Sequence, residues 1–178
     1  MMDFTGKCAL ITGAAGGIGG AIARLLHSQG AGVALTDMNR EGMDKLAAEL
    51  GERVHVLEAN LSDPEAPAEL VKKAVEAMER IDILVNNAGL TRDNLAMRMK
   101  DEDWQLVIDV NLTAAFRLAR ACMRPMMKQR FGRVVGIASI VGVTGNAGQV
   151  NYAASKGGMI AMSKSLAQEV AARGITVN

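Results

Sequence analysis

The chain of 178 residues is poor in aromatic residues and histidine: it has one tryptophan, one tyrosine, three phenylalanines and two histidines. Two histidines without paired ligand spacing argue against a metal site. Cysteine is also scarce. Cys8 lies in an apolar run and Cys122 in a helical pattern, which indicates buried thiols in a reducing compartment rather than a disulfide framework.

The chain also lacks an excess of charge of either sign and any long apolar run. Its formal net charge is +1, so the chain lacks the excess of positive charge that is typical of proteins that bind nucleic acid. No apolar stretch reaches the length that crosses a bilayer, and the first residues, with Asp3 before any apolar run, do not resemble a signal peptide. We therefore expect a cytoplasmic protein with no nucleic-acid or membrane partner, forming a single domain over residues 1–178.

Short apolar runs alternate with helical patterns along the whole chain. Strands are predicted at Cys8–Ile11, Val33–Leu35, Val54–Leu57, Ile81–Val85, Val134–Ile137 and, as the start of a sixth, Ile175–Val177. Helices are predicted at residues 18–29, 41–50, 64–79, 102–128 and 151–173. Asp63 as an N-cap before Pro64 indicates a helix start, whereas Gly30 and Gly174 indicate helix ends. The alternation predicts an α/β fold, a doubly wound parallel sheet with helices on both faces.

A glycine-rich segment, Thr12–Gly20, follows the first strand and opens into a helix. Glycines allow the backbone to approach a pyrophosphate at a helix N-terminus, where N–H groups favour negative charge. Because the segment has the strand, loop and helix context that this motif requires, it predicts a dinucleotide site rather than a flexible turn. The expected contacts are Gly13, Gly16, Gly17, Ile18 and Gly19.

The ends of the next strands extend this site. Asp37 can accept both ribose hydroxyls of NAD and would repel the 2′-phosphate of NADP, although Arg40 could reach such a phosphate. Asn60 and Leu61 are expected to border the adenine. The segment Asn86–Gly89 is expected to line the crevice at the carboxyl edge of the sheet, with Asn87, Ala88 and Gly89 as cofactor contacts.

Tyr152 and Lys156 are four residues apart and share one helix face. A tyrosine normally holds its proton near neutral pH, and a neighbouring ammonium favours the phenolate form, which suits proton transfer. Ser139 follows the fifth apolar run, thirteen residues upstream. Alone, such a pair is more often part of a solvated helix face, so a catalytic role for it can be inferred only together with other motifs of the chain.

Together these residues resemble the short-chain dehydrogenase/reductase family over the whole chain. The matching motifs are TGxxxGxG at Thr12–Gly19, NNAG at Asn86–Gly89, Asn111, Ser139 and YxxxK at Tyr152–Lys156. Within that family, the segments Gly89–Leu95, Met97–Lys100, Gly145–Tyr152 and Gly174–Asn178 look like the bacterial 3-oxoacyl-[acyl-carrier-protein] reductases. The resemblance implies NAD(P)H-dependent reduction of 3-oxoacyl-[acyl-carrier-protein] to the 3-hydroxyacyl form in fatty acid biosynthesis.

The resemblance also implies roles for four catalytic residues. Tyr152 would protonate the developing alkoxide, and Ser139 would hydrogen-bond and orient the carbonyl oxygen. Lys156 would hold the nicotinamide ribose and favour the phenolate, whereas Asn111 would support a water path that reprotonates the site. Such preorganised donors aimed at a developing oxyanion commonly lower a barrier by a few kcal/mol.

Two departures from the pattern bear on cofactor and completeness. The carrier-protein reductases usually have an arginine in the glycine loop, where this chain has Gly16. Together with Asp37, this favours NADH, although NADPH is typical of the group. Relatives in the family also continue beyond Asn178 with further strand, turn and helical elements, so the C-terminal elements are expected to be missing from this sequence.

The substrate and partners leave alternatives open. Arg130 and Arg173 are candidates for docking an acidic carrier protein. The helical patterns at 102–128 and 151–173 are apolar on more than one face, and the family resemblance implies a tetramer. An alternative hypothesis, also an enzyme, is an NADH-linked short-chain alcohol or 3-hydroxyacyl-CoA dehydrogenase. A reading of another class is a noncatalytic dinucleotide-binding module.

Overall fold

Six parallel strands form one sheet in a computed structural model that describes residues 2–178. The strands are β1 (Cys8–Thr12), β2 (Gly32–Thr36), β3 (Val54–Val56), β4 (Ile83–Asn86), β5 (Gly132–Gly136) and β6 (Ile175–Val177). Their order in the sheet is β3-β2-β1-β4-β5-β6. The chain therefore builds outward from β1 to β3, then crosses back to β4 and builds outward on the other side, which is the doubly wound arrangement.

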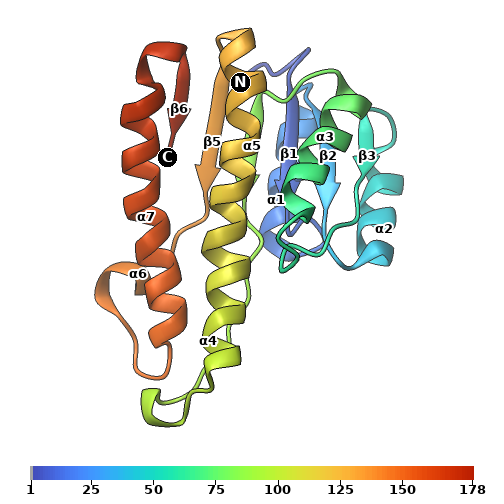
Figure 1. Ribbon diagram of the computed structural model, residues 1–178. Helices are drawn as coiled ribbons and strands as arrows, with labels where there is room; N and C mark the ends of the chain where they lie inside the picture. Colours follow the sequence, from blue (N-terminus) through green and yellow to red (C-terminus); the bar gives the residue numbers. More distant parts are fainter. Residues whose placement is uncertain (1) are drawn as a thin grey trace.

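Helices cover both faces of this sheet (Figure 1). The helices are α1 (Gly17–Ser28), α2 (Arg40–Leu50), α3 (Ala66–Met78), α4 (Asp101–Ile108), α5 (Ala114–Gln129), α6 (Val141–Thr144) and α7 (Val150–Val170). One apolar layer joins the sheet to α1 and α2, and the other joins it to α3, α5 and α7. The predicted fold class, with its parallel sheet between two layers of helices, is confirmed.

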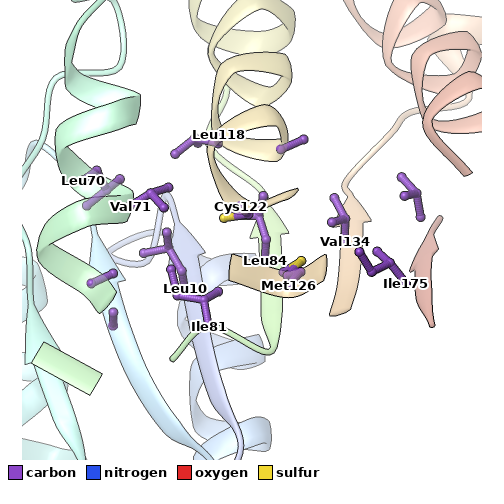
Figure 2. Packing of buried hydrophobic residues seen from close by; sticks show 14 of the residues in the cluster. Leu10, Leu70, Val71, Ile81, Leu84, Leu118, Cys122, Met126, Val134 and Ile175 are labelled. Carbon is purple, nitrogen blue, oxygen red and sulfur yellow. The ribbon is translucent and has the colours of Figure 1, made fainter. Parts of the chain in front are cut away.

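The alternation of side chains along each strand explains the two layers. In β1, Ala9 and Ile11 pack toward α1 and α2, whereas Leu10 between them packs toward α3 and α5. Strands buried on both faces appear in sequence as continuous apolar runs. Figure 2 shows the second layer, where side chains of the sheet meet those of the covering helices; its labelled members include Leu10, Leu70, Leu84, Leu118, Cys122, Met126 and Val134.

The two cysteines differ in burial. Cys122 is fully buried in this core, and burial raises the pKa of its thiol to about 12. Cys8 is only partly buried, and its thiol donates to the Met78 carbonyl (3.6 Å). Both are free thiols; the predicted burial is found for Cys122, whereas Cys8 is only partly buried.

The predicted start of the third helix is wrong by two residues. The helix begins at Ala66, with Glu65 at the N-cap position and Pro67 in its first turn. Asp63 instead forms a turn, because its Oδ1 accepts the N–H of Glu65 at 3.0 Å. An Asx turn and an N-cap use the same residue types, so the dipeptide Asp63–Pro64 does not distinguish them.

The helix predicted at 102–128 contains a local change of winding. Residues Asp109–Thr113 form a π-helical segment between α4 and α5. Such segments are frequent at functional sites, and this one contains Asn111, which is fully buried. The apolar pattern of a helix does not indicate one wide turn, so the sequence did not predict it.

Both predicted helix ends are confirmed. Gly30 follows α1 with φ +98°, and Gly174 follows the last turn before β6 with φ +71°. These left-handed conformations favour glycine.

The strands that follow such turns run parallel, so all of their carboxyl ends lie at one edge of the sheet, where the functional residues collect. Within residues 2–178, no helix combines the length and apolar character needed to cross a membrane.

Candidate active site

A cavity of about 710 Å³ opens at the carboxyl edge of the sheet, between the glycine loop and the start of α7. It joins most of the residues predicted from the sequence. Those lining it are Gly13, Gly16, Gly17, Ile18, Gly19, Asp37, Asn87, Ala88, Gly89, Ser139, Tyr152 and Lys156. Leu90, Thr91, Ile137 and Ala138 complete its lining. Its volume lies in the range of cofactor and ligand sites.

The glycine loop is packed so closely that side chains are excluded at two positions. A Cβ on Gly19 would lie 2.2 Å from the Gly13 carbonyl oxygen, and a Cβ on Gly13 would lie 2.7 Å from Nδ2 of Asn87. In the described chain no side chain caps the N-terminus of α1, so its first-turn N–H groups remain available to an anion. These observations fit the pyrophosphate of a dinucleotide.

Asn87 fastens the glycine loop to the end of β4. Its Nδ2 donates to the carbonyl oxygens of Thr12 (2.9 Å) and Gly13 (3.1 Å). The Thr12 hydroxyl donates to the Val85 carbonyl at 3.2 Å and accepts the N–H groups of Asn87 (3.1 Å) and Ala88 (3.0 Å). The side chain of Asn87 therefore supports the cavity wall that it also lines, and its direct contact with the cofactor stays a prediction.

Asp37 places a carboxylate at the end of β2. Its Oδ2 accepts the N–H of Ala15 at 3.1 Å and its Oδ1 accepts the N–H of Asn39 at 3.0 Å. The side chain lines both the main cavity and an adjoining one. Arg40 is engaged elsewhere, because its Nε donates to both oxygens of Asp44 at 2.9 and 3.0 Å. This geometry presents a negative charge, without a neutralising arginine, to the part of the site next to the glycine loop.

Asn60 and Leu61 line the adjoining cavity of about 180 Å³, together with Thr36, Met38 and Val110. The Asn60 side chain is held in a turn, since its Oδ1 accepts from the N–H (3.1 Å) and hydroxyl (2.8 Å) of Ser62. Leu61 is 7% exposed. Both residues therefore border a small compartment beside Asp37, and the adenine contact expected for them stays a prediction.

Ser139, Tyr152 and Lys156 meet on the far side of the main cavity. Ser139 follows β5, and its Oγ accepts the N–H of Val141 at 3.3 Å, which leaves the hydroxyl proton available for a ligand. Tyr152 and Lys156 lie one turn apart near the start of α7, and the Lys156 Nζ is 5.7 Å from the centre of the Tyr152 ring. Two hydroxyls and an ammonium thus face one cavity.

Lys156 is held in place before any ligand is considered. Its side chain is 3% exposed, and its Nζ donates to the Ile137 carbonyl at 2.6 Å. Burial lowers the pKa of the Lys156 ammonium, because a charged group is poorly solvated there. The sign follows directly: as pH rises, Lys156 loses its charge at a lower pH than an exposed lysine.

Asn111 lies behind the cavity wall rather than in it. Its Oδ1 accepts the N–H of Leu90 (2.8 Å), and its Nδ2 donates to the Leu90 carbonyl (2.9 Å) and to Oγ of Ser155 (3.2 Å). The side chain is therefore fully engaged with protein groups. The water path predicted for Asn111 stays a prediction.

Comparison with known proteins agrees with this geometry. Residues 7–178 match the short chain dehydrogenase family. The chain belongs to this family. It is 58% identical over 178 residues to nodulation protein G of Rhizobium sp. (strain N33), covering all of this chain and 73% of that protein. It is 52% identical over 177 residues to the 3-oxoacyl-[acyl-carrier-protein] reductase FabG of Escherichia coli, covering 99% of this chain and 72% of that protein.

A solved structure from Sinorhizobium meliloti, described as a short-chain alcohol dehydrogenase, has the same fold. The TM-score is 0.95 at 36% identity, covering 99% of this chain and 71% of that one. As a short-chain dehydrogenase, the protein is an NAD(P)-dependent oxidoreductase. The strand order and the main cavity at the carboxyl edge supply the structural basis for this chemistry.

Arg130 and Arg173, predicted to dock a carrier protein, lie at the opposite edge of the sheet in this short-chain dehydrogenase. Arg130 directly follows α5 and precedes β5, and Arg173 precedes β6, so both lie where these strands begin. They are near each other, since a Cβ on Gly174 would lie 2.5 Å from the Arg130 carbonyl oxygen. Within one chain they do not border the cavity.

Sequence reasoning missed the polar residues that hold the site from behind. These are Thr12, Asn151 and Ser155, which make the hydrogen bonds between the cavity-lining segments. One signal was available for two of them: Asn151 and Ser155 repeat the four-residue spacing of Tyr152 and Lys156, displaced by one position.

Proposed function

We propose that this protein reduces 3-oxoacyl thioesters carried on acyl carrier protein to the 3-hydroxyacyl form. The observation that carries the proposal is the meeting of Ser139, Tyr152 and Lys156 in the cavity that begins at the glycine loop. The identity of 52% to a 3-oxoacyl-[acyl-carrier-protein] reductase over almost the whole chain supports the same substrate class.

Bound in this cavity, a reduced nicotinamide dinucleotide supplies the hydride that adds to the keto carbon. The protein's part is to bind and orient the substrate and to move one proton. The Ser139 hydroxyl donates a hydrogen bond to the keto oxygen, and the Tyr152 phenol gives its proton to that oxygen as negative charge develops there. The Lys156 ammonium, 5.7 Å from the tyrosine ring, stabilises the phenolate left behind.

A second candidate keeps the chemistry and changes the substrate to a short-chain alcohol or a 3-hydroxyacyl-CoA, with NAD as cofactor. Asp37 is the observation in its favour, because its carboxylate lies beside the glycine loop and Arg40 is paired with Asp44. The 36% identical structure described as a short-chain alcohol dehydrogenase points the same way.

The two candidates differ in what the enzyme recognises beyond the thioester. We expect a higher kcat/KM for acetoacetyl-[acyl-carrier-protein] than for acetoacetyl-CoA when NADH or NADPH oxidation is followed. Replacing Arg130 and Arg173 together by glutamate should remove that advantage by raising KM for the carrier-linked substrate only. Because both arginines lie at the amino edge of the sheet, this docking requires a second copy of the chain to present them beside the cavity.

The control is the CoA thioester, which lacks the acidic carrier. Equal effects of the double replacement on both thioesters would contradict docking by these arginines, and a preference for acetoacetyl-CoA or alcohols would favour the second candidate. Cofactor binding with no turnover of any of these compounds would instead favour a noncatalytic dinucleotide-binding module.

We also propose that the protein forms a tetramer and is located in the cytoplasm, as the sequence predicts. Apolar side chains on α5 support an assembly, since Phe116 is 39% and Met127 is 40% exposed. Exposed large apolar residues that gather on one helix are suited to contact with another chain.

We propose NADH as the favoured cofactor, and Asp37 provides the test. Replacing Asp37 by asparagine keeps an acceptor for the Ala15 N–H but removes the charge that would repel a 2′-phosphate. The ratio of kcat/KM for NADPH to that for NADH should rise about ten- to a hundredfold, which corresponds to about 1.4–2.8 kcal/mol of relieved repulsion. Steady-state kinetics with both cofactors measure this ratio.

Glu41→Gln is the matched control for Asp37→Asn. Glu41 is an exposed acid in the first turn of α2 that pairs with Lys45 at 2.7 Å and does not line the cavity. Its replacement removes the same charge from the same region. A cofactor ratio that shifts equally in both variants, or in neither, would refute the discriminating role of Asp37.

A further inference from the structure

The helix that carries Tyr152 and Lys156 has a second polar pair on an adjacent face. Asn151 and Ser155 each precede one member of the first pair by one residue, and both are fully buried at 0% exposure. The large majority of buried polar side chains in proteins are hydrogen-bonded, because burying an unpaired polar group costs free energy. Their partners therefore show what this face of α7 is built to contact.

Asn151 joins three segments. Its Nδ2 donates to the Arg92 carbonyl at 2.9 Å and, more weakly, to the Asp103 carbonyl at 3.5 Å. Its Oδ1 accepts the N–H of Tyr152 at 2.8 Å. One side chain thus ties the segment after β4 and the start of α4 to the backbone of the tyrosine itself.

Ser155 makes the equivalent connection one turn later. Its hydroxyl donates to the Tyr152 carbonyl at 2.8 Å and accepts from Nδ2 of Asn111 at 3.2 Å. Asn111 in turn bonds both the N–H and the carbonyl of Leu90. The peptide groups on both sides of the Tyr152 side chain are therefore hydrogen-bonded to residues that lead to the segment after β4.

That segment forms a wall of the cavity. Leu90 and Thr91 line it together with Tyr152, and the network holds the backbone at Leu90 and Arg92, on both sides of Thr91. A solvent-exposed hydrogen bond also connects the two segments, because the Gln149 side chain donates to the Asp93 carboxylate at 2.9 Å. The buried bonds thus fix the distance between the cavity wall and the helix that presents the phenol.

We propose that Asn151 and Ser155 are positioning residues, which hold Tyr152 in register with the cavity wall formed by Leu90 and Thr91. This inference rests on the proposed role of Tyr152 as the proton donor. Neither side chain lines the cavity, so neither is a catalytic residue. Their effect acts through the position of the tyrosine, and small displacements of a reacting group are costly in rate.

The decisive variants are Ser155→Ala and Asn151→Ala, with Ser165→Ala as the control, because Ser165 is an exposed serine on the same helix. We expect kcat to fall roughly ten- to a hundredfold in the first two variants, whereas KM for the cofactor stays unchanged. The near-ultraviolet circular dichroism band of tyrosine should also change; measured in a Trp104→Phe background, which removes the overlapping tryptophan band, it reports on Tyr152 because the chain has one tyrosine and one tryptophan. Ser165→Ala should change neither.

Thermal melting of each variant shows whether it is folded. If Asn151→Ala does not fold, Ser155→Ala alone tests the positioning role. Folded variants that keep the parental kcat and tyrosine band, with only a lower melting temperature, would overturn the proposal and leave a structural role. The dichroism readout needs no turnover. It therefore tests the positioning even if the parent protein proves inactive on acyl thioesters, which would count against the proposed substrate instead.

Discussion

Replacing Tyr152 by phenylalanine should remove nearly all turnover while leaving cofactor binding nearly intact. The change removes one oxygen from a side chain that lines the cavity together with Ser139 and Lys156 and preserves the ring. Without the phenol, no group in that position can give a proton to the keto oxygen, and general acid catalysis typically contributes about 10²–10⁴-fold. We therefore expect kcat to fall by about that factor in steady-state assays.

Cofactor affinity is the internal control for this prediction. The glycine loop and Asp37, which make the expected contacts at the other end of the cavity, are unaffected by the loss of the hydroxyl. Titration of NADH, followed by its own fluorescence, should give a Kd close to that of the parent. A variant that binds NADH normally and retains most of its kcat would show that another group donates the proton.

Replacing Gly19 by alanine should disrupt the cofactor loop. The added Cβ would lie 2.2 Å from the Gly13 carbonyl oxygen and 2.8 Å from Nδ2 of Asn87, so backbone atoms must move. Inserting a methyl group into a closely packed site typically costs about 1–3 kcal/mol. We expect a loss of this size in the free energy of unfolding, measured in urea without cofactor, and a large loss of NADH affinity.

Gly17 offers a matched comparison two residues earlier in the same helix. Among the described residues nothing lies within 4 Å of a Cβ placed there. Alanine is favoured over glycine in a helix by up to about 1 kcal/mol, so Gly17→Ala should leave the free energy of unfolding unchanged or raise it. Equal destabilisation by both replacements would mean that the close contact at Gly19 is not what matters.

The fold could be predicted because its strands are buried on both faces. Continuous apolar runs such as those of β1 and β4 are typical of a parallel sheet covered by helices on both sides, and the helical runs between them supply the crossovers. Boundaries were harder to predict. Asp63 forms a turn where an N-cap was expected, since local side-chain bonds to the backbone serve both purposes.

The site was predictable to the extent that its residues directly follow strands. The glycine loop, Asp37, Asn87 and Ser139 all do so, and the parallel sheet brings them to one edge. Asn151 and Ser155 were not predictable in this way, because their distant partners, the Arg92 carbonyl and the Asn111 side chain, lie 59 and 44 residues away in the chain. For Arg130 and Arg173, positive charge alone suggested a role at the mouth of the cavity. The topology places both at the other edge of the sheet, where β5 and β6 begin.

The hydroxyl of Thr12 has a consequence for the thermodynamics of ligand binding. With one bond donated to Val85 and two accepted from Asn87 and Ala88, it uses its proton and both lone pairs. Together with the Asn87 amide, it connects the glycine loop to the end of β4 in the free protein. Ordering a loop on association subtracts from affinity. A ligand that enters this cavity meets a loop already in place, so more of its contact energy is expressed as binding.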